Sequence, residues 1–159
     1  MRVLRNEEPF ESFVVSKALR GGYKNTAQPH LTVAKKILRR TGEAVPSGSR
    51  VPYVFVEDPA NADALLSERA EDPAYAREHG LVIDRLHYIR HQLQSPITAL
   101  LDVLVDHPER ELFDENIAPL VKELEDQQAA WARRAKHAKY NAAHGQPEIT
   151  SFFRPAPSV

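Results

Sequence analysis

Paired carboxylates are the first residues of this sequence whose types and spacing could do chemistry. Glu57 and Asp58 form one pair, and Glu71 and Asp72 form another. Neighbouring carboxylates can hold the metal ions that many phosphoryl-transfer enzymes use. In both pairs, however, the aspartate precedes a proline, and this order is typical of a capped helix start. We therefore interpret Asp58 and Asp72 as helix caps and expect this chain to bind no metal and no cofactor.

Nucleophilic chemistry has little support elsewhere in the chain. The sequence contains no cysteine, which excludes thiol nucleophiles, disulfides and zinc–cysteine sites. Ser16 lies next to Lys17, but no recognisable base accompanies it. The seven histidines form no His-Glu-x-x-His pattern, and the glycines at 21–22 lack the spacing of a phosphate-binding loop. We expect no catalytic residue in this chain.

Basic residues gather in the first third of the chain. Residues 1–45 contain nine lysines and arginines against four acids, whereas residues 57–90 contain four arginines against eight acids. The whole chain has a formal net charge of -1, so the asymmetry is local. It indicates an anionic partner for the first third, with ordinary solvated charge as the alternative. A second basic run at 133–139 is interpreted as a solvated face, with a phosphate contact or a nuclear-import-like cluster as alternatives.

The stretch 145–159 carries a different recognition pattern. Gln146, Ile149, Phe152 and Phe153 have the spacing of the sliding-clamp-binding motif known as the PIP box. One 3₁₀ turn would place the first three on one face, with Phe153 beside them. Two adjacent phenylalanines in a flexible tail are then exposed so that a clamp can bury them. A tail that folds back onto its own domain is the alternative.

The elements that must position these residues are predicted to be mostly helices with a small β element. The stretch 28–41 is typical of a helix, with Pro29 in the first turn and Gly42 at the stop. The stretch 50–58 alternates as a strand, and Pro52 favours an edge strand or a strand start. The fold class predicted from these elements is α+β.

Further helices are predicted in the second half. Asp84 is expected to cap one helix and Ser95, which precedes a proline, to cap another that ends at His107. A last long helix is expected over about 117–143. The apolar residues expected to be buried on these last two helices are Ile97, Leu100, Leu101, Leu104 and Val105 on the first, and Leu120, Leu124 and Trp131 on the second.

Two blocks of motifs follow one another at characteristic spacing. The first block comprises Val14–Leu19, Tyr23, Gln28–Leu31, the basic stretch Lys35–Arg40 and Ser49–Val54, which reads Ser-Arg-Val-Pro-Tyr-Val. The second block comprises Glu71-Asp72-Pro73, Glu78-His79, Ile83-Asp84, Tyr88 and Gln92–Pro96. Together, over roughly 11–105, these blocks resemble the thumb of family B DNA polymerases, most closely the DNA polymerase delta group.

The sequence also departs from the family pattern. Val82 stands where the family has a proline before Ile-Asp, and a second tyrosine beside Tyr88 is missing. The cysteine clusters of the delta group are absent, and in this the chain is similar to the polymerases of large DNA viruses. The palm motifs that carry the family's catalytic carboxylates do not occur. The resemblance therefore implies a part of a DNA-directed DNA polymerase that does not polymerise alone, with Mg²⁺ expected only in the palm of the full enzyme.

The resemblance implies a thumb that grips primer–template duplex DNA, mostly through phosphates rather than base edges. The residues that would contact DNA are Ser16, Lys17, Tyr23, Lys24, Lys35, Lys36, Arg39, Arg40 and Arg50. The sliding clamp would bind through the PIP box, and a separate chain carrying exonuclease, palm and fingers is a further candidate partner. The alternatives are a non-catalytic clamp-binding accessory or remnant protein, and an unrelated helical adaptor.

Three parts are expected along the chain. A thumb-like domain would occupy 1–110, a helical extension 111–144, and the clamp-binding tail 145–159. No apolar run is long enough to span a bilayer, and the N-terminus lacks the apolar segment of a signal peptide. We therefore expect an intracellular protein without a membrane partner, located in the nucleus or at a viral replication site.

Overall fold

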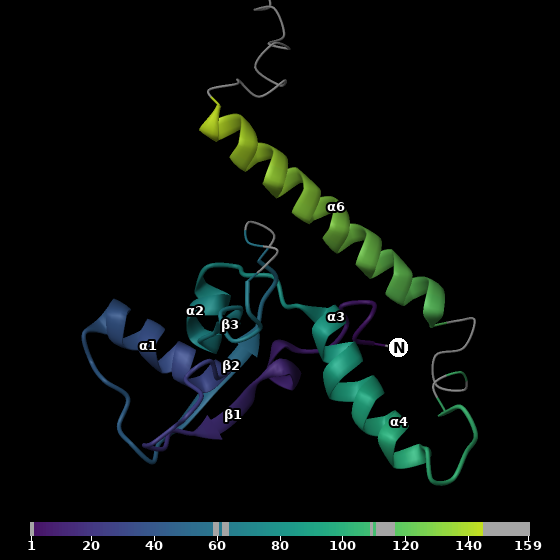
Figure 1. Cartoon of the computed structure of the whole chain (residues 1–159), viewed down its shortest axis with the longest axis horizontal. Coiled ribbons are helices and arrows are strands. Elements are labelled where there is room, and N and C mark those ends of the chain that lie inside the picture. Colours follow the sequence, from purple (N-terminus) through teal and green to yellow (C-terminus); the bar gives the residue numbers. More distant parts are fainter. Residues whose placement is uncertain (1, 59–60, 62–63, 109, 111–116, 145–159) are drawn as a thin grey trace, which may run out of the picture.

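A computed structural model describes residues 2–58, 61, 64–108, 110 and 117–144 of the chain. A small antiparallel sheet with two helices packed against it forms the body, a helical arm of residues 85–101 leaves the body, and a long helix crosses above (Figure 1). Most of the regular structure is helical, so the predicted α+β class is confirmed.

The sheet consists of three strands in the order β1-β2-β3. β1 (Val15–Ala18) pairs antiparallel with β2 (Arg50–Phe55). The last two residues of β2 pair with the short strand β3 (Ala70–Glu71), also antiparallel. The predicted strand at 50–58 is thus confirmed over its first six residues.

Pro52 lies in the central strand of the sheet and not in an edge strand. It sits opposite Ser16 of β1. Hydrogen-bonded pairs alternate along an antiparallel ladder, and the Leu19 nitrogen donates to the Ser49 oxygen over 2.8 Å, so the Pro52 nitrogen faces away from β1. β3 does not extend that far along β2. Pro52 therefore removes no ladder hydrogen bond, and the predicted position near the strand start is confirmed.

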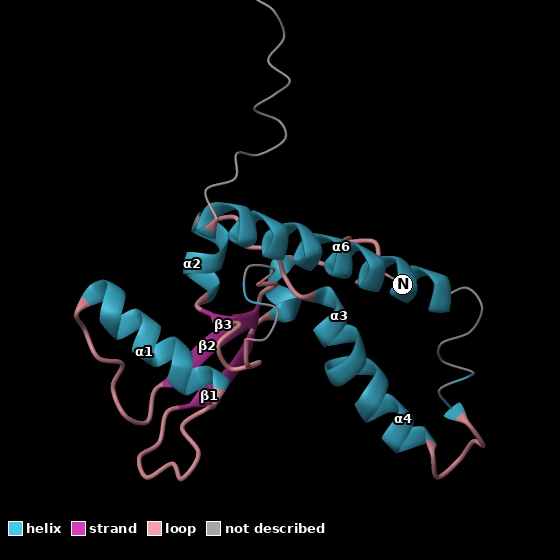
Figure 2. Ribbon diagram, turned by 45° about the horizontal axis from the view of Figure 1, so that its top comes forward, coloured by secondary structure: helices cyan, strands magenta, loops and turns pink. Residues whose placement is uncertain are grey.

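α1 (Pro29–Thr41) lies against the sheet, as Figure 2 shows. Its first residue is a proline, and it ends at Gly42, whose φ of 76° is the left-handed conformation that glycine adopts without strain. The Gly42 nitrogen donates to the Leu38 oxygen over 2.9 Å. Both predicted ends of this helix are confirmed. His30 and Val33 are fully buried on its sheet-facing side.

Tyr88 joins three elements at the centre of the core. Its hydroxyl donates to the Phe13 carbonyl of the 3₁₀ turn Phe10–Phe13 over 2.7 Å and accepts from the Phe55 nitrogen of β2 over 3.0 Å. Burial raises the pKa of Tyr88 to about 12. The phenol therefore stays protonated and serves as a fixed polar link inside an apolar core.

Two aspartates cap short helices as predicted. The Asp72 carboxylate accepts from the Tyr75 nitrogen over 3.0 Å at the start of α2 (Pro73–Glu78). The Asp84 carboxylate accepts from the His87 nitrogen over 3.0 Å at the start of α3 (Arg85–His87). Each cap satisfies a backbone donor that has no partner within the first helical turn.

α4 (Ser95–Leu101) begins at Ser95, but the predicted capping role of Ser95 is wrong, because the backbone before it is already helical. α3 continues into a π-helical stretch, Tyr88–Gln94, and then into α4 without a break. Pro96 would clash with the carbonyl four residues earlier in a regular α-helix. The wider π turns directly before it accommodate the proline within a continuous helix.

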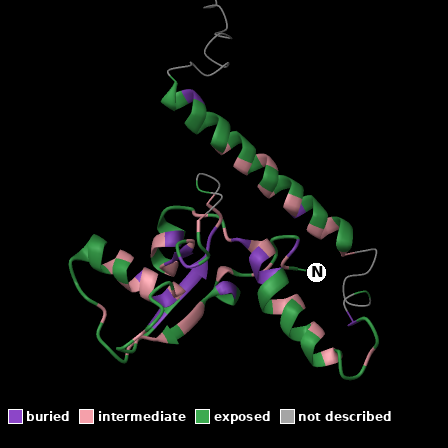
Figure 3. Cartoon of the chain, in the orientation of Figure 1, coloured by how far each residue is buried: buried purple, intermediate pink, exposed green. Residues whose placement is uncertain are grey.

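α4 is shorter and more exposed than predicted. It ends at Leu101 and not at His107, and it contains no buried residue. Leu100 is 73% exposed and Leu104 is 77% exposed, and Figure 3 shows this arm mostly in the colour of exposed residues. No other described element covers the predicted stripe, so the burial that would stabilise two more helical turns is missing.

The last helix, α6 (Ala118–Ala143), is confirmed at its predicted position. Leu124 is buried against Leu4 and Ile89, and the predicted Leu120 is partly buried beside them. Trp131 is 39% exposed, so its predicted burial is wrong. It lies beyond the apolar contacts of the helix, at a pocket described below. Within the described part of the chain, no helix is long and apolar enough to cross a bilayer.

We predict that Tyr88→Phe lowers the free energy of unfolding by about 1–3 kcal/mol, because the buried Phe13 carbonyl and Phe55 amide lose their partner. Denaturant titration followed by circular dichroism measures the change. Tyr140→Phe is the matched control, because Tyr140 is 55% exposed and should change stability by less than about 0.5 kcal/mol. Equal effects of the two substitutions would contradict this role of the Tyr88 hydroxyl.

Candidate nucleic-acid interface

Two of the four cations on α1 are engaged by one buried carboxylate. Arg40 donates two parallel hydrogen bonds of 2.8 Å each to the two oxygens of Glu71. Lys36 lies 3.3 Å from the same carboxylate and also donates to the carbonyls of Glu68 and Ala70, over 2.9 and 2.7 Å. Lys36 thus uses all three of its donors, and this cluster fastens α1 to β3.

The charges around Glu71 compensate for its burial. The side chain is only 6% exposed, and desolvation alone would raise its pKa. The hydrogen bonds from Arg40 and from the Asp72 nitrogen, together with the charge of Lys36, outweigh desolvation and hold the pKa below its ordinary value. The Arg40 guanidinium also stacks over Tyr75, 3.4 Å from the ring centre. Lys36 and Arg40 therefore have a structural task, and their predicted phosphate contact stays a prediction.

The Tyr23 hydroxyl is fully engaged by its own loop and by α1. It donates to the Ala18 carbonyl over 3.1 Å and accepts from the Arg20 nitrogen over 3.0 Å. The ring nitrogen Nε2 of His30 lies 3.0 Å away and must be the donor, because the hydroxyl proton is already used. The donor and both acceptor positions of the hydroxyl are thus used within the protein, and the predicted phosphate contact of Tyr23 stays a prediction. Tyr23 and His30 hold the loop 19–28 against the buried start of α1.

His30 is neutral in this arrangement. Its side chain is fully buried, and its other ring nitrogen, Nδ1, has no partner among the described residues. Burial lowers the pKa of His30, and the nearby charge of Lys17 lowers it further. A neutral imidazole that donates through Nε2 satisfies both observations.

Three of the remaining predicted residues form local contacts. Arg50 of β2 reaches across to β1, where its guanidinium donates to the Ser16 hydroxyl over 3.0 Å and to the Ser16 carbonyl over 2.7 Å. Lys17 donates to the Gln28 side chain over 3.2 Å at the surface. These contacts lie at the surface and involve no acidic group, so a phosphate can compete for Lys17 and Arg50.

Lys24, Lys35 and Arg39 are exposed, and none has a polar side-chain partner in the part of the chain that the structure describes. Lys35 and Arg39 lie one turn apart on the exposed side of α1. Arg20, which the motif comparison did not select, is equally exposed in the loop that Tyr23 holds. Its place between Lys17 and Lys24, which are both predicted to contact DNA, could have indicated Arg20 as a further DNA contact.

A polar contact that no motif or periodicity indicated fastens α6 to the body. The Gln128 amide donates to the Glu57 carboxylate over 2.9 Å and to the Asp84 carboxylate over 3.1 Å. Arg69 forms an ion pair with Asp84 from the other side. Burial raises the pKa of Glu57, and the neighbouring charge of Asp84 adds to this effect against the hydrogen bond from Gln128.

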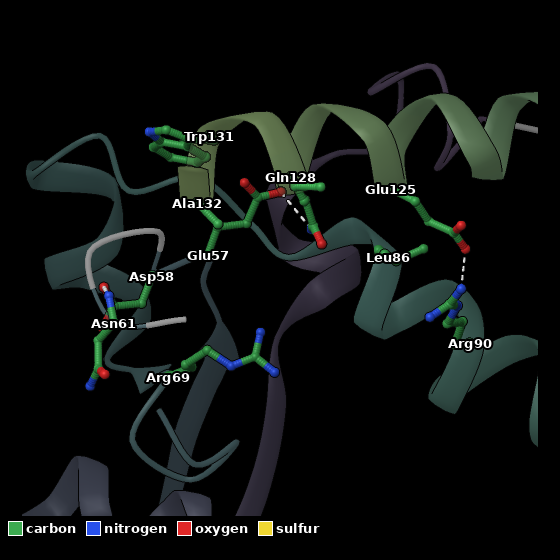
Figure 4. A pocket seen from close by; sticks show the side chains of 11 residues that line it. Glu57, Asp58, Asn61, Arg69, Leu86, Arg90, Glu125, Gln128, Trp131 and Ala132 are labelled. Carbon is green, nitrogen blue, oxygen red and sulfur yellow. Dashed lines mark hydrogen bonds and ion pairs between the residues drawn. The ribbon is translucent and has the colours of Figure 1, made fainter. Parts of the chain in front are cut away.

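A pocket of about 460 Å³ opens beside this contact (Figure 4). Trp131 lies at one end and the ion pair between Arg90 and Glu125 at the other, with Arg69 and Asp58 along the body side. Its lining carries both signs of charge, so it favours no particular ligand. No group of three potential metal ligands occurs among the described residues. Asp72 caps α2, and Asp58 accepts a hydrogen bond from the Asn61 nitrogen, while its predicted helix start falls on residues outside the described ones.

The predicted clamp-binding residues lie outside the described residues. Gln146, Ile149, Phe152 and Phe153 all fall within 145–159. The PIP box therefore stays a prediction from the sequence.

Comparison with known proteins shows the family of the chain. Residues 1–104 match the family described as DNA polymerase family B. The chain is 52% identical over 157 residues to the DNA polymerase of Paramecium bursaria Chlorella virus NY2A, a match that covers 96% of this chain and 17% of that protein. It is 34% identical over 116 residues to the DNA polymerase delta catalytic subunit of Caenorhabditis elegans, covering 70% of this chain and 10% of that protein.

A third relative agrees with these two. The DNA polymerase delta catalytic subunit of Dictyostelium discoideum is 31% identical over 108 residues, which cover 67% of this chain and 10% of that protein. The chain belongs to DNA polymerase family B. It spans less than a fifth of the length of each of these relatives.

We predict that Glu71→Gln lowers the free energy of unfolding by about 1–3 kcal/mol at pH 7, because Lys36 and Arg40 lose their buried counter-charge. The folded-state pKa of Glu71 lies below its unfolded value. The stabilisation is therefore fully present above about pH 4.5 and is lost as the pH falls through the folded pKa. Denaturant titrations of wild type and variant should converge in acid.

Glu43→Gln is the matched control, because Glu43 is exposed and its side chain has no ion pair among the described residues. It should leave stability within about 0.5 kcal/mol of wild type at every pH. A Glu71→Gln protein as stable as this control would show that the ion pair contributes nothing.

Proposed function

We propose that this chain is the thumb portion of a DNA-directed DNA polymerase and that it grips the primer–template duplex through phosphate contacts. The observation that carries the proposal is a group of exposed cations inside the segment that matches the family, none of which has an acidic partner among the described residues: Lys17, Lys24, Lys35 and Arg39. Phosphate contacts supply affinity and register without reading sequence, which is what a polymerase that moves along any template requires.

The engaged residues have a supporting part in this proposal. Glu71 holds α1 through Lys36 and Arg40, so that Lys35 and Arg39 are left on its exposed side. Tyr23 and His30 hold the loop that carries Lys24. Cations that a rigid scaffold holds in place give up less conformational freedom when they meet a phosphate.

Nucleotide incorporation is proposed to belong to other regions of the polymerase. The described residues contain no group of carboxylates that could hold the metal ions of nucleotidyl transfer. In this proposal Mg²⁺ and the catalytic carboxylates lie in a palm, and the thumb keeps the primer terminus in register with it.

We predict that the full chain binds duplex DNA weakly, without sequence preference and with a steep dependence on salt. The test is fluorescence anisotropy of a labelled primer–template duplex at several salt concentrations. Lys17→Ala combined with Lys24→Ala should flatten the slope of log K against log salt by about two, because each lost phosphate contact removes about 0.9 from it.

Lys122→Ala is the control, because Lys122 lies on α6 beside Glu123 and Asp126 and outside the family match. It should leave the slope unchanged. A slope that the double substitution leaves unchanged would remove Lys17 and Lys24 from the interface.

We propose a second function for the segment 145–159, which is to tether the polymerase to a sliding clamp. The spacing of Gln146, Ile149, Phe152 and Phe153 supports it. Burying each large apolar side chain in a clamp pocket contributes roughly 1.5–3 kcal/mol, and ordering the segment offsets part of this. A clamp that encircles the same duplex would raise the effective concentration of both contacts.

We predict that the full chain binds the sliding clamp of its own replication system with modest affinity, measured by calorimetry. Phe152→Ala with Phe153→Ala should abolish the heat of binding, because both aromatic anchors are removed. Ser158→Ala is a control outside the motif and should bind like wild type. Clamp binding that survives the double substitution would refute the motif.

A further inference from the structure

The second half of α6 concentrates positive charge on an exposed helix. Residues 127–144 contain four cations, Arg133, Arg134, Lys136 and Lys139, and no acid. All four are exposed, and the helix is continuous through them to Ala143. In Figure 1 this end of α6, drawn in yellow-green, points away from the sheet and from α4. The segment also lies outside the residues that match the family.

Compensation of the helix dipole does not explain these cations. Positive charge near the C-terminal end of a helix is favourable, but the effect falls off within the last turn. The last turn of α6 contains no basic residue. The cations lie one to three turns earlier, where the dipole contributes little to their energy.

Ion pairing within the helix does not explain them either. Residues three or four apart on a helix are neighbours, so an acid at such a spacing could offset each cation. No acid occurs at any of these positions, because the acids nearest in sequence are Asp126 and Glu148. Across the described residues, none of the four cations forms an ion pair or a side-chain hydrogen bond.

Packing and membrane binding also fail as explanations. Among the described residues after Trp131, which end at His144, only Asn141 is buried, and it contacts His137 of the same helix. A helix that lies in a membrane surface carries large apolar residues opposite its cations. Here the positions that continue the face of Leu124 are alanines, Ala135, Ala138 and Ala142.

We propose that residues 131–144 of α6 form a second contact with the phosphate backbone of duplex DNA, apart from the contact at β1 and α1. This inference rests on the proposed function, which brings a duplex to the same chain. A duplex is the occupant that fits, because it presents closely spaced negative charge along its whole length. Arg133, Lys136 and Lys139 recur every three residues and so follow one inclined stripe of the helix. A stripe of point charges matches a row of phosphates and reads no bases.

The anchoring of α6 makes this contact stiff. Leu124 in the core and Gln128 at Glu57 and Asp84 fix the first half of the helix to the body. The residues after Trp131 then extend about 18 Å at 1.5 Å per residue. Alanine-rich sequence keeps such an unsupported segment helical. The second contact therefore lies at a set direction from the first, and the two together cover a longer stretch of duplex than either alone.

The experiment uses the full chain and a labelled blunt duplex of mixed sequence, with anisotropy measured over a series of salt concentrations. In the neutralised variant, the substitutions are Arg133→Gln, Arg134→Gln, Lys136→Gln and Lys139→Gln. Glutamine keeps helix propensity, and circular dichroism checks that the helix remains. The slope of log K against log salt should flatten by about two to four, since each phosphate contact contributes about 0.9. A charge-preserving variant, in which each Arg becomes Lys and each Lys becomes Arg, should keep the wild-type slope.

The outcomes separate this inference from the proposed function. A neutralised variant with an unchanged slope overturns the second contact. If Lys17→Ala with Lys24→Ala flattens the slope in the same series, the proposed grip at β1 and α1 stands without the α6 contact. A flattened slope in the neutralised variant alone supports the α6 contact and removes the grip at β1 and α1. A wild-type chain whose binding shows no salt dependence overturns both.

Discussion

One buried carboxylate, that of Asp84, holds the parts of this molecule together. It is 3% exposed and caps α3 through the His87 nitrogen, while its own backbone nitrogen donates to the Phe55 carbonyl at the end of β2. Arg69 offsets its charge, and the oxygen that caps α3 also accepts a hydrogen bond from the Gln128 amide of α6. Without these partners a buried carboxylate would be strongly unfavourable. The need to satisfy it therefore fixes the sheet, the helical arm and the long helix relative to one another.

The cations of the first third show how a fold divides a charge pattern that looks uniform in sequence. Of the four on α1, the two that face β3 share one counter-charge, Glu71, and the two on the exposed side have no ion pair among the described residues. A half-buried ion pair contributes to stability only with complete hydrogen bonding, which Lys36 and Arg40 provide. Donors that are used in this way are less available to a phosphate. The surplus of basic residues in 1–45 therefore overstates what a polyanion can meet.

The sequence predicted well the features that neighbouring residues decide. The end of α1 at Gly42 and the caps Asp72 and Asp84 follow from local hydrogen bonds, and the structure places all three as expected. The family resemblance, confirmed over 1–104, also rests on short motifs. What could not be predicted depends on residues far apart in sequence. Gln128 meets Glu57 from 71 residues away, and no periodicity reveals such a contact.

The π-helical stretch Tyr88–Gln94 changes the rotational phase of everything that follows it on the arm. In an uninterrupted α-helix, residues at spacings of three and four from Ile89 stay on one side, and Leu93, Leu100 and Leu104 would continue its buried face. Each π turn takes in one more residue than an α turn, so the side chains beyond it point in a new direction. A pattern that is regular in sequence therefore becomes irregular in space. The leucines of α4 thus leave the face that Ile89 defines, and α4 buries no residue on any of its faces.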